Sequence, residues 1–329
     1  MKITDFAGYG DRLIQLMRSV QAGRIVHALL FTGPHGSGKR TMARLFAQAM
    51  LCRGMGERPC GVCPACQRFE NGTHPDVRVV RMPADKKYIV VAQIRELIDY
   101  LSLNPYEGGR HIVIIEQADR LTPSAQNALL KTLETPPGDA MFILISEAAG
   151  SLLPTILSRC LTVRFHDLSP EDCAGVLEGR GIDPDTARRL AGMAQGSVGR
   201  ALELSRDEDY MAMRGRVIQS LESLKDRASV MTAASFIADK KAPEDGALEV
   251  MELWARDLMA VQSGAQPRQG DEAARLARSK LDGSELLKGV IGLRKALESN
   301  VAWPNALEDM YFKLIDTGNN GRTVLSWQR

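Results

Sequence analysis

A glycine-rich segment early in the chain has the residue types and spacing of a phosphate-binding loop. Gly33 and Gly38 are separated by four residues that include Gly36, and Lys39 follows directly. Glycines let backbone N–H groups surround phosphate oxygens, and a lysine at this position reaches the outer phosphates of a nucleotide. The segment lies between an apolar run and a helical pattern, which is the context such a loop requires. The sequence therefore predicts a cradle for ATP or ADP; the alternative is a glycine turn that only joins strand to helix.

The residues that would carry out hydrolysis beside this loop are replaced. Magnesium needs a hydroxyl directly after the lysine, but Arg40 holds that position and the hydroxyl of Thr41 comes one residue late. A one-residue shift rotates a helical side chain by about 100°, so Thr41 is not expected to substitute. Glu116 follows an apolar run, where a metal-binding acid is expected, but Gln117 then replaces the general base. We expect absent or very weak ATPase activity, and a role for Mg²⁺ stays open. The candidate cofactor-binding residues are Gly33, Gly36, Gly38, Lys39, Arg40, Thr41 and Glu116.

A cluster of cysteines predicts a structural metal site. Its members are Cys52, Cys60, Cys63 and Cys66. Four thiolates suit tetrahedral Zn²⁺, and Cys-x-x-Cys pairs have the turn geometry of structural sites, in which protein fills every coordination position. A redox role for these thiols is the alternative. His74 is a spare candidate ligand, although a turn beside Pro75 accounts for it more simply. Cys160 and Cys173 have no partner at metal spacing and are expected in the core.

The elements that must position these residues follow from the periodicity. Short apolar runs alternate with helical patterns over the first 165 residues, which predicts a parallel sheet covered by helices. Strands are predicted at 28–32, 77–80, 112–115, 141–146 and 161–165. Further along, strands disappear and apolar residues recur three and four apart, as around Trp254, which predicts a helical bundle. The expected domains are an α/β domain at 1–165, a small helical domain at 166–205 and an all-α domain at 206–329.

Composition excludes several classes of protein. Apolar residues make up 44% and charged residues 25%, the balance of a soluble globular protein. The longest apolar runs span about six residues, far below the roughly 18 that a membrane span needs. The N-terminus lacks the apolar core of a signal peptide, so a cytoplasmic location is expected. A net charge of +2 and 5% aromatic residues give no argument for a free nucleic-acid surface. Arg53, Arg58 and Arg68 flank the cysteines, but nearby glutamates dilute them, so a solvated surface is favoured over direct DNA contact.

Several segments resemble the bacterial clamp-loader ATPases of the AAA+ superfamily. The lead-in Arg24-x2-His27-Ala28-x-Leu30-Phe31 is similar to that family's approach to the phosphate loop, and the cysteine insertion is similar to its zinc module. The runs 127–137 and 153–160 resemble two further family signatures. These matches cover roughly the first 165 residues. Weaker matches at 253–258 and 300–314 are more similar to delta-prime subunits of DNA polymerase III than to the gamma/tau motor subunits.

This resemblance implies a fold and a set of partners. The fold would be a RecA-like domain, a small helical lid and a helical collar that joins subunits into a hetero-pentameric ring. The partners would be gamma/tau and delta subunits of the DNA polymerase III holoenzyme, with which the chain would help load the sliding clamp onto primer-template DNA in replication. No membrane is implied.

The resemblance also implies roles for particular residues. Arg159 would be an arginine finger that acts in trans on the ATP site of a neighbouring subunit, where a guanidinium stabilises the transferring phosphoryl group; a surface salt bridge is the alternative. Gly199 stands where motor subunits carry a nucleotide-sensing arginine, and Arg200 follows one residue late. Together with Arg40 and Gln117, these departures describe a stator that lends a finger and does little chemistry itself. The alternative is an active gamma/tau-like motor ATPase.

Overall fold

The computed structural model describes residues 15–16, 18–19, 22, 27–107, 109–238, 244–267 and 273–324, so Arg24 of the lead-in motif lies outside the described residues. The chain divides into two compact units. The first comprises Met1–Asp172 with Ser197–Gly199, and the second comprises Cys173–Gly196 with Arg200–Arg329.

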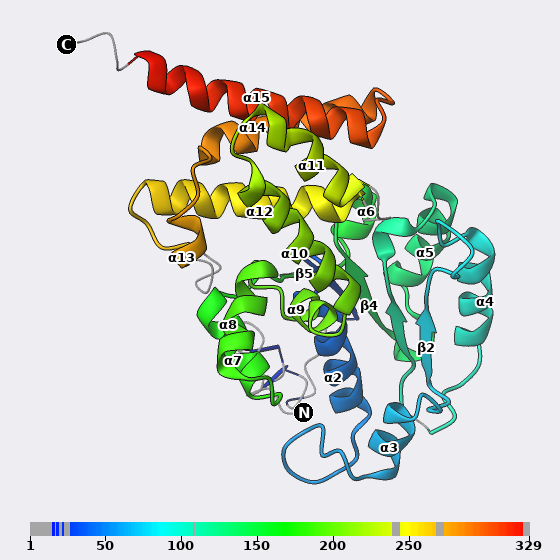
Figure 1. The fold of residues 1–329 in the computed structure, drawn as a ribbon. Helices are drawn as coiled ribbons and strands as arrows, with labels where there is room; N and C mark the ends of the chain where they lie inside the picture. The colour runs from blue at the N-terminus through cyan, green and yellow to red at the C-terminus, as the bar shows by residue number, and fades with distance from the viewer. Residues whose placement is uncertain are drawn as a thin grey trace. The chain divides into compact units, whose positions relative to one another are not determined.

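The first unit is built on a parallel sheet whose strands coincide with the predicted apolar runs (Figure 1). The strands are β1 (Ala28–Thr32), β2 (Val77–Val80), β3 (Ile112–Ile115), β4 (Met141–Ser146) and β5 (Leu161–Arg164). Their order in the sheet is β2-β3-β4-β1-β5, and Phe142 of β4 lies opposite Ala28 on one side and Val113 on the other. The last strand ends one residue before its predicted end, although Phe165 still donates its N–H to Thr32 O at 2.7 Å. The predicted α/β class is confirmed.

Helices cover both faces of this sheet because its central strands β3, β4 and β1 are buried on both faces. The helices and short 3₁₀ turns are α2 (Lys39–Leu51), α3 (Pro64–Glu70), α4 (Val91–Leu101), η2 (Ala118–Arg120), α5 (Pro123–Glu134), η3 (Pro137–Asp139), η4 (Ala149–Ser151) and α6 (Pro154–Leu157). Phe31 of β1 packs with Phe46 of α2 and Phe69 of α3. On the opposite face, Leu30 lies in one cluster with Leu129 of α5 and residues of α4. The carboxyl ends of the strands, where the phosphate loop begins, are therefore held between two helical layers.

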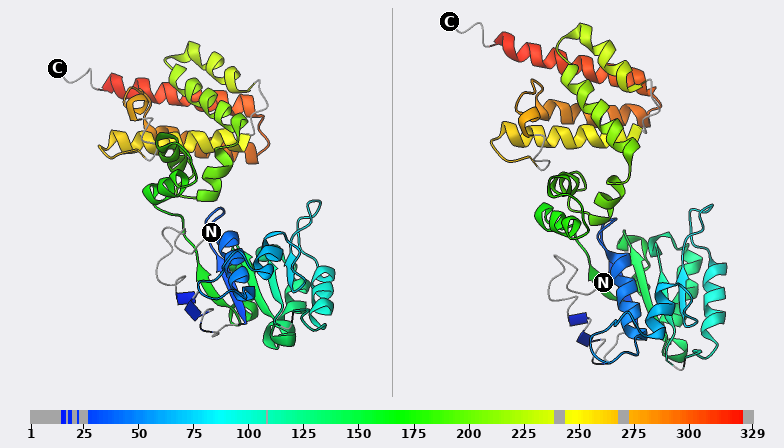
Figure 2. Two further views of the ribbon diagram at one scale, coloured as in Figure 1. Left: turned by 90° about the horizontal axis from the view of Figure 1, so that it is seen from below. Right: turned by 60° about the horizontal axis from the view of Figure 1, so that its bottom comes forward.

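The second unit is helical, as predicted for the C-terminal part of the chain (Figure 2). From the unit boundary onward the helices are α7 (Pro170–Glu178), α8 (Pro184–Met193), α9 (Val198–Leu204), α10 (Glu208–Ser223), α11 (Arg227–Ala238), α12 (Glu244–Gln262), α13 (Ala273–Leu276), α14 (Gly283–Glu298) and α15 (Trp303–Val324). Helices α10 to α15 share one apolar core, in which Trp254 and Tyr311 are fully buried. Ser220 Oγ lies 2.9 Å from Tyr311 Oη, so the buried hydroxyl of Tyr311 is satisfied. Among the described residues, no helix is long and apolar enough to cross a membrane.

Candidate functional site

The glycine-rich segment forms a loop with the backbone conformation that a phosphate cradle needs. Gly36 and Gly38 have φ angles of 74° and 87°, which favour glycine. A Cβ atom on Gly33 would lie 2.3 Å from Phe165 O, so that position also requires glycine. Gly38 precedes α2 and provides no side-chain cap, which leaves the first amides of the helix available to an anion. The loop fits a phosphate group.

Lys39 is held inside this loop. Its Nζ donates to Gly33 O at 2.7 Å and to Pro34 O at 2.5 Å. An ammonium group has three donors, and Nζ lies at the longer distance of 3.4 Å from Ser37 Oγ. Burial lowers the pKa of Lys39, and nearby carboxylates, among them Glu147, oppose that shift. Two of its donors fix the lysine to the loop, and the third can reach a phosphate.

Glu116, the candidate metal-binding acid, is surrounded by guanidinium groups. Arg40 Nε lies 2.9 Å from Glu116 Oε1 and Arg81 Nε lies 3.2 Å from Glu116 Oε2, and the glutamate side chain is only 12% exposed. Magnesium needs carboxylate oxygens that face the ion in near-octahedral geometry, but each oxygen of Glu116 faces a guanidinium group, and these two cations repel a third. Gln117, the next residue, cannot take a proton from water through its amide. Thr41 lines a surface pocket with Arg40 and other residues of α2. The residues present therefore do not fit Mg²⁺.

The end of β4 contributes polar groups that the sequence analysis missed. Ser146 is 1% exposed, and among the described residues its Oγ has no hydrogen-bond partner. Its carbonyl accepts the N–H of Gly33 at 3.3 Å, so it lies directly beside the phosphate loop. Glu147 follows and forms a 2.9 Å contact with His35 Nδ1. A polar residue that ends a predicted central strand is the signal that could have found this position. A buried hydroxyl without a partner fits a polar ligand in the adjoining loop.

A segment distant in sequence also contacts the phosphate loop within the first unit. The N–H of Gly199 donates to Gly36 O at 3.0 Å, and Ser197 Oγ donates to His35 O at 2.9 Å. A Cβ atom on Gly199 would lie 2.6 Å from Gly36 Cα, so only glycine allows this approach. Gly199 thus fits against the loop because it has no side chain.

The cysteine cluster has the geometry of a metal site. It consists of Cys52, Cys60, Cys63 and Cys66, whose sulfur atoms all lie within 4.8 Å of one another. A Zn–S distance of about 2.3 Å gives tetrahedral S–S edges of about 3.8 Å, so a small convergence would complete the site. Backbone N–H groups of Gly54 and Cys60 point at Cys52 Sγ, each at 3.4 Å. A Cβ atom on Gly54 would lie 2.7 Å from Cys60 Sγ. These residues fit a structural Zn²⁺ ion.

The thiols of this cluster differ in how readily they ionise. Burial opposes ionisation of Cys63, but hydrogen bonds from the backbone amides of Cys66 and Arg53 lower its pKa to about 6. Burial raises the pKa of the Cys66 thiol. One thiolate is thus already favoured, and a bound Zn²⁺ would displace the protons of the others.

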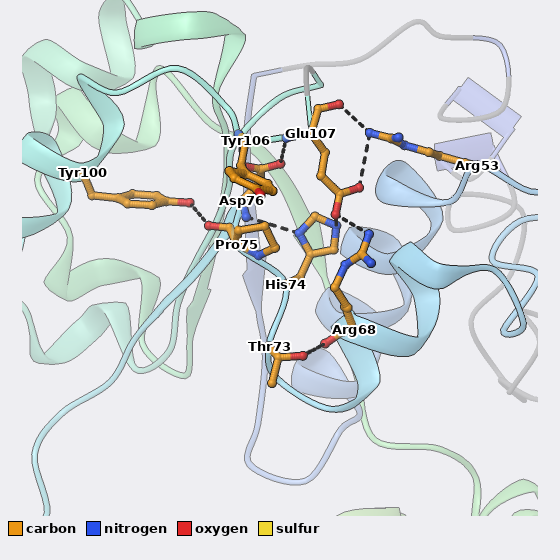
Figure 3. A network of polar contacts seen from close by, with 9 residues as sticks. All are labelled: Arg53, Arg68, Thr73, His74, Pro75, Asp76, Tyr100, Tyr106 and Glu107. Atoms are coloured by element: carbon orange, nitrogen blue, oxygen red, sulfur yellow. Dashed lines mark hydrogen bonds and ion pairs between the residues drawn. The ribbon is translucent and has the colours of Figure 1, made fainter.

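A polar network joins the cysteine module to the edge of the sheet (Figure 3). Glu107 lies between Arg53, whose Nη2 is 3.2 Å from Oε2, and Arg68, which pairs with Oε1. His74 Nε2 lies 3.9 Å from the same Oε1, and its Nδ1 accepts the N–H of Asp76 at 3.2 Å. His74 is therefore turned toward a carboxylate and lies outside the cysteine group. Two of the three arginines that flank the cysteines pair with Glu107, which offsets one of their two positive charges and so weakens the case for DNA contact there.

The relatives of the chain identify its family. Residues 10–169 match a family model described as DNA polymerase III, delta subunit. DNA polymerase III subunit delta' of Bacillus subtilis (strain 168) is 33% identical over 313 residues, which cover 91% of this chain and 94% of that protein. The chain belongs to the DNA polymerase III delta-prime family.

Two other relatives match this chain over shorter stretches, and one solved structure is weakly similar over most of it. Subunit delta' of Pseudomonas aeruginosa is 44% identical over 136 residues, 41% of this chain and 42% of that protein. Subunit tau of Escherichia coli (strain K12) is 35% identical over 208 residues, 61% of this chain and 32% of that protein. A crystal structure of a DNA polymerase III gamma subunit-related protein from Thermotoga maritima superposes with a TM-score of 0.46 at 15% identity, over 92% of this chain and 99% of that one.

Arg159 lies two residues after the end of α6 and is partly exposed. Its Nη1 donates to Thr155 O at 2.9 Å, and its Nη2 pairs with Glu134 at the end of α5. The side chain is 32% exposed. The ion pair corresponds to the salt bridge that was the alternative to the finger role, and the guanidinium remains accessible from one side. Cys160 beside it is buried, as predicted, and burial raises its pKa to about 11.

Arg200, the other arginine that the resemblance singled out, forms contacts within the second unit. Its Nη2 lies 2.9 Å from Glu249 Oε2, and its guanidinium lies over the ring of Tyr210.

Arg81, which pairs with Glu116, was also missed from the sequence, although it directly follows the predicted strand at 77–80. Its pairing with Glu116 depends on β2 and β3 being neighbours in the sheet.

Proposed function

We propose that this chain is a stator subunit of a DNA polymerase III clamp loader: it does not hydrolyse ATP and supplies Arg159 to the ATP site of a neighbouring subunit. The observation that carries the proposal is the pairing of Glu116 with Arg40 and Arg81. Each oxygen of this carboxylate already faces a guanidinium group, so a metal ion would have to approach two cations to reach it. The delta-prime relatives support the type of subunit, since delta-prime is the printed name of several of them.

The chain's own pocket supports binding without turnover. Lys39 and the loop amides can hold the outer phosphates of ATP or ADP, and the Ser146 hydroxyl can add a polar contact. Hydrolysis needs a group that orients and deprotonates water, and Gln117 stands where that group would be. Bound nucleotide would therefore stay intact in this pocket.

The surroundings of Arg159 suit a group that acts on a neighbour. An exposed ion pair such as Arg159–Glu134 contributes about 0–1 kcal/mol, so exchanging Glu134 for a phosphate group costs little. A guanidinium offers fixed donors to the transferring phosphoryl group, and such fingers supply about 10³–10⁵ in rate. Glu134 holds the arginine in position until a neighbouring site provides a more negative partner.

The rest of the chain has structural tasks in this proposal. Residues 166–205 form the lid and residues 206–329 form the collar through which gamma/tau and delta subunits join this chain in a hetero-pentamer. The four cysteines hold a structural Zn²⁺ ion. The sliding clamp and primer-template DNA are reached through the whole complex, which works in the cytoplasm.

The alternative is an active motor ATPase of the gamma/tau type. Two observations favour it: the phosphate loop is intact, and subunit tau of Escherichia coli is 35% identical over 208 residues. The two functions differ in what the isolated chain does. Steady ATP hydrolysis by the purified chain in Mg²⁺, abolished by Lys39→Ala, would overturn the stator proposal. Negligible turnover that becomes substantial only when gamma/tau and delta subunits are added would support it.

The finger role is tested in the reconstituted complex. Arg159→Ala should leave assembly intact on size-exclusion chromatography and should abolish the contribution of one ATP site, because that site loses roughly 10³-fold or more in rate. Arg188→Ala is a matched control, since Arg188 also forms an exposed ion pair, with Asp185. Equal ATP turnover in both variants would contradict the finger role.

A further inference from the structure

We propose that Arg40 takes the place of a magnesium ion, so that this chain binds a nucleoside di- or triphosphate without any divalent cation. The inference rests on the proposed function in one respect, namely that the phosphate loop is kept for binding and not for turnover. The ligand class is set by the loop, and the metal independence is set by the residues around Glu116.

Arg40 is located where a metal-ligating hydroxyl would be. It follows Lys39 in the first turn of α2, so its side chain starts from the position that normally supplies the magnesium ligand. The guanidinium reaches the end of β3, where Nε lies 2.9 Å from Glu116 Oε1. Glu116 is mostly buried and its other oxygen is paired with Arg81. The carboxylate that would orient a metal thus orients an arginine.

The charges at this point favour a phosphate and disfavour a metal. The two guanidinium groups and one carboxylate leave a net charge of about +1. A Mg²⁺ ion here would meet two cations and a carboxylate whose two oxygens each already face a guanidinium group, whereas a phosphate oxygen would meet a cation. Within the part of the chain that the structure describes, the ion pair of Arg40 uses Nε, and the side chain is 60% exposed. The two terminal nitrogens of its fork can therefore donate to phosphate oxygens.

Among the described residues, the other carboxylates near Lys39 form no group that could hold a metal ion. Glu147 forms its 2.9 Å contact with His35 Nδ1, and Asp119 Oδ1 accepts the N–H of Glu147 at 3.0 Å. Burial raises the pKa of Asp167, which disfavours its charged form. Positive charge for the phosphates is thus supplied by Lys39 and Arg40 themselves.

The test measures nucleotide affinity of the full chain by calorimetry, with ADP and ATP as probes, in Mg²⁺ and in EDTA. Wild-type affinity should be the same within about twofold in both buffers. Arg40→Ser should lose roughly tenfold to a hundredfold in EDTA, the range for one charge-assisted hydrogen bond to a phosphate. It should regain part of that loss in Mg²⁺. Arg44→Ser is the matched control on the same helix, because Arg44 pairs with Glu70 and not with Glu116.

Each other outcome is decisive. Wild-type binding that requires Mg²⁺ overturns the inference, as does an Arg40→Ser variant with unchanged affinity in EDTA. Absence of nucleotide binding in both buffers also overturns the inference about Arg40. The stator proposal stays intact in that case if the complex still loses ATP turnover when Arg159 is replaced by alanine. Steady hydrolysis by the isolated chain would instead overturn the stator proposal. Lys39→Ala should abolish binding in both buffers, which shows that the measured site is the phosphate loop.

Discussion

Gln126 connects helix α5 to the segment that leads to Arg159. Its Nε2 donates to Leu121 O and to Ser151 O, both at 3.2 Å, and its Oε1 accepts the N–H of Leu153 at 2.7 Å. The side chain is 3% exposed, so water does not compete for these partners. We predict that this single amide fixes the start of α6, and that Gln126→Met will loosen it.

The expected loss follows from the groups left behind. Methionine keeps the volume of glutamine, but two backbone carbonyls and one N–H lose their partner. Each unsatisfied buried group costs about 1–3 kcal/mol, and partial relaxation brings the sum to about 2–5 kcal/mol. For a unit of this size, 1 kcal/mol corresponds to about 2–4 °C. The midpoint of thermal unfolding of the first unit should therefore fall by about 4–20 °C.

Gln93→Met is the matched control for this experiment. Gln93 also bonds to backbone through both amide atoms, to Arg81 O at 3.0 Å and to the N–H of Val90 at 3.2 Å, but water reaches these groups. Its loss should cost less than about 1 kcal/mol. Unfolding followed by circular dichroism measures both variants, and hydrogen exchange over 148–160 reports the local effect. Equal stability of the two variants, or unchanged exchange in that segment, would refute the reasoning.

Three further predictions concern other parts of the chain. Purified wild type should contain about one Zn²⁺ per chain by elemental analysis, and Cys60→Ser should lose it. Cys160→Ser is the control, since Cys160 is buried outside the cluster. An equal loss of zinc from this control would contradict a zinc site at the four clustered cysteines. Gly199→Ala should lower the unfolding free energy by about 1–3 kcal/mol through its clash with Gly36. By contrast Gly215→Ala, whose Cβ meets nothing within 4 Å, should raise it by about 0.5–1 kcal/mol; a gain in both is the adverse result. Hydrogen bonds from Ser284 and Glu285 lower the pKa of Asp282 from its ordinary 3.8, so the stability it contributes is present above that pH and is lost as the pH falls below it. Urea unfolding at about pH 5 and about pH 3 should show a smaller loss in Asp282→Asn than in wild type, and identical losses would exclude the effect.

The three central strands could be predicted because each is mainly a run of apolar residues. Residues 112–115 and 141–145 are apolar on both faces and flanked by polar residues, so their bounds follow closely from the sequence alone. The cysteine cluster was predictable for a similar reason, because its ligands are close in the chain. The sheet order is a different matter. It depends on which strands pair after the chain has folded back, and no local pattern contains that information.

The interactions that decide the chemistry are those between distant segments. Arg40 and Gln117 could be recognised as replacements, but the pairing of Arg40 with Glu116 requires α2 and β3 to meet. The contact of Gly199 with Gly36 spans an even longer stretch of chain. Glu107 had no signal in the sequence, since its arginine partners come from the cysteine module.

The strand order also has a consequence for synthesis of the protein on the ribosome. Strand β1 is made early, but its sheet neighbours are β4 and β5, and Ala28 must pair with Phe142. At about 5–20 residues per second, the nascent chain carries this apolar strand unpaired for on the order of 5–20 s. Chaperones that bind extended apolar segments therefore have a defined target, the run Ala28–Thr32, until β4 leaves the exit tunnel.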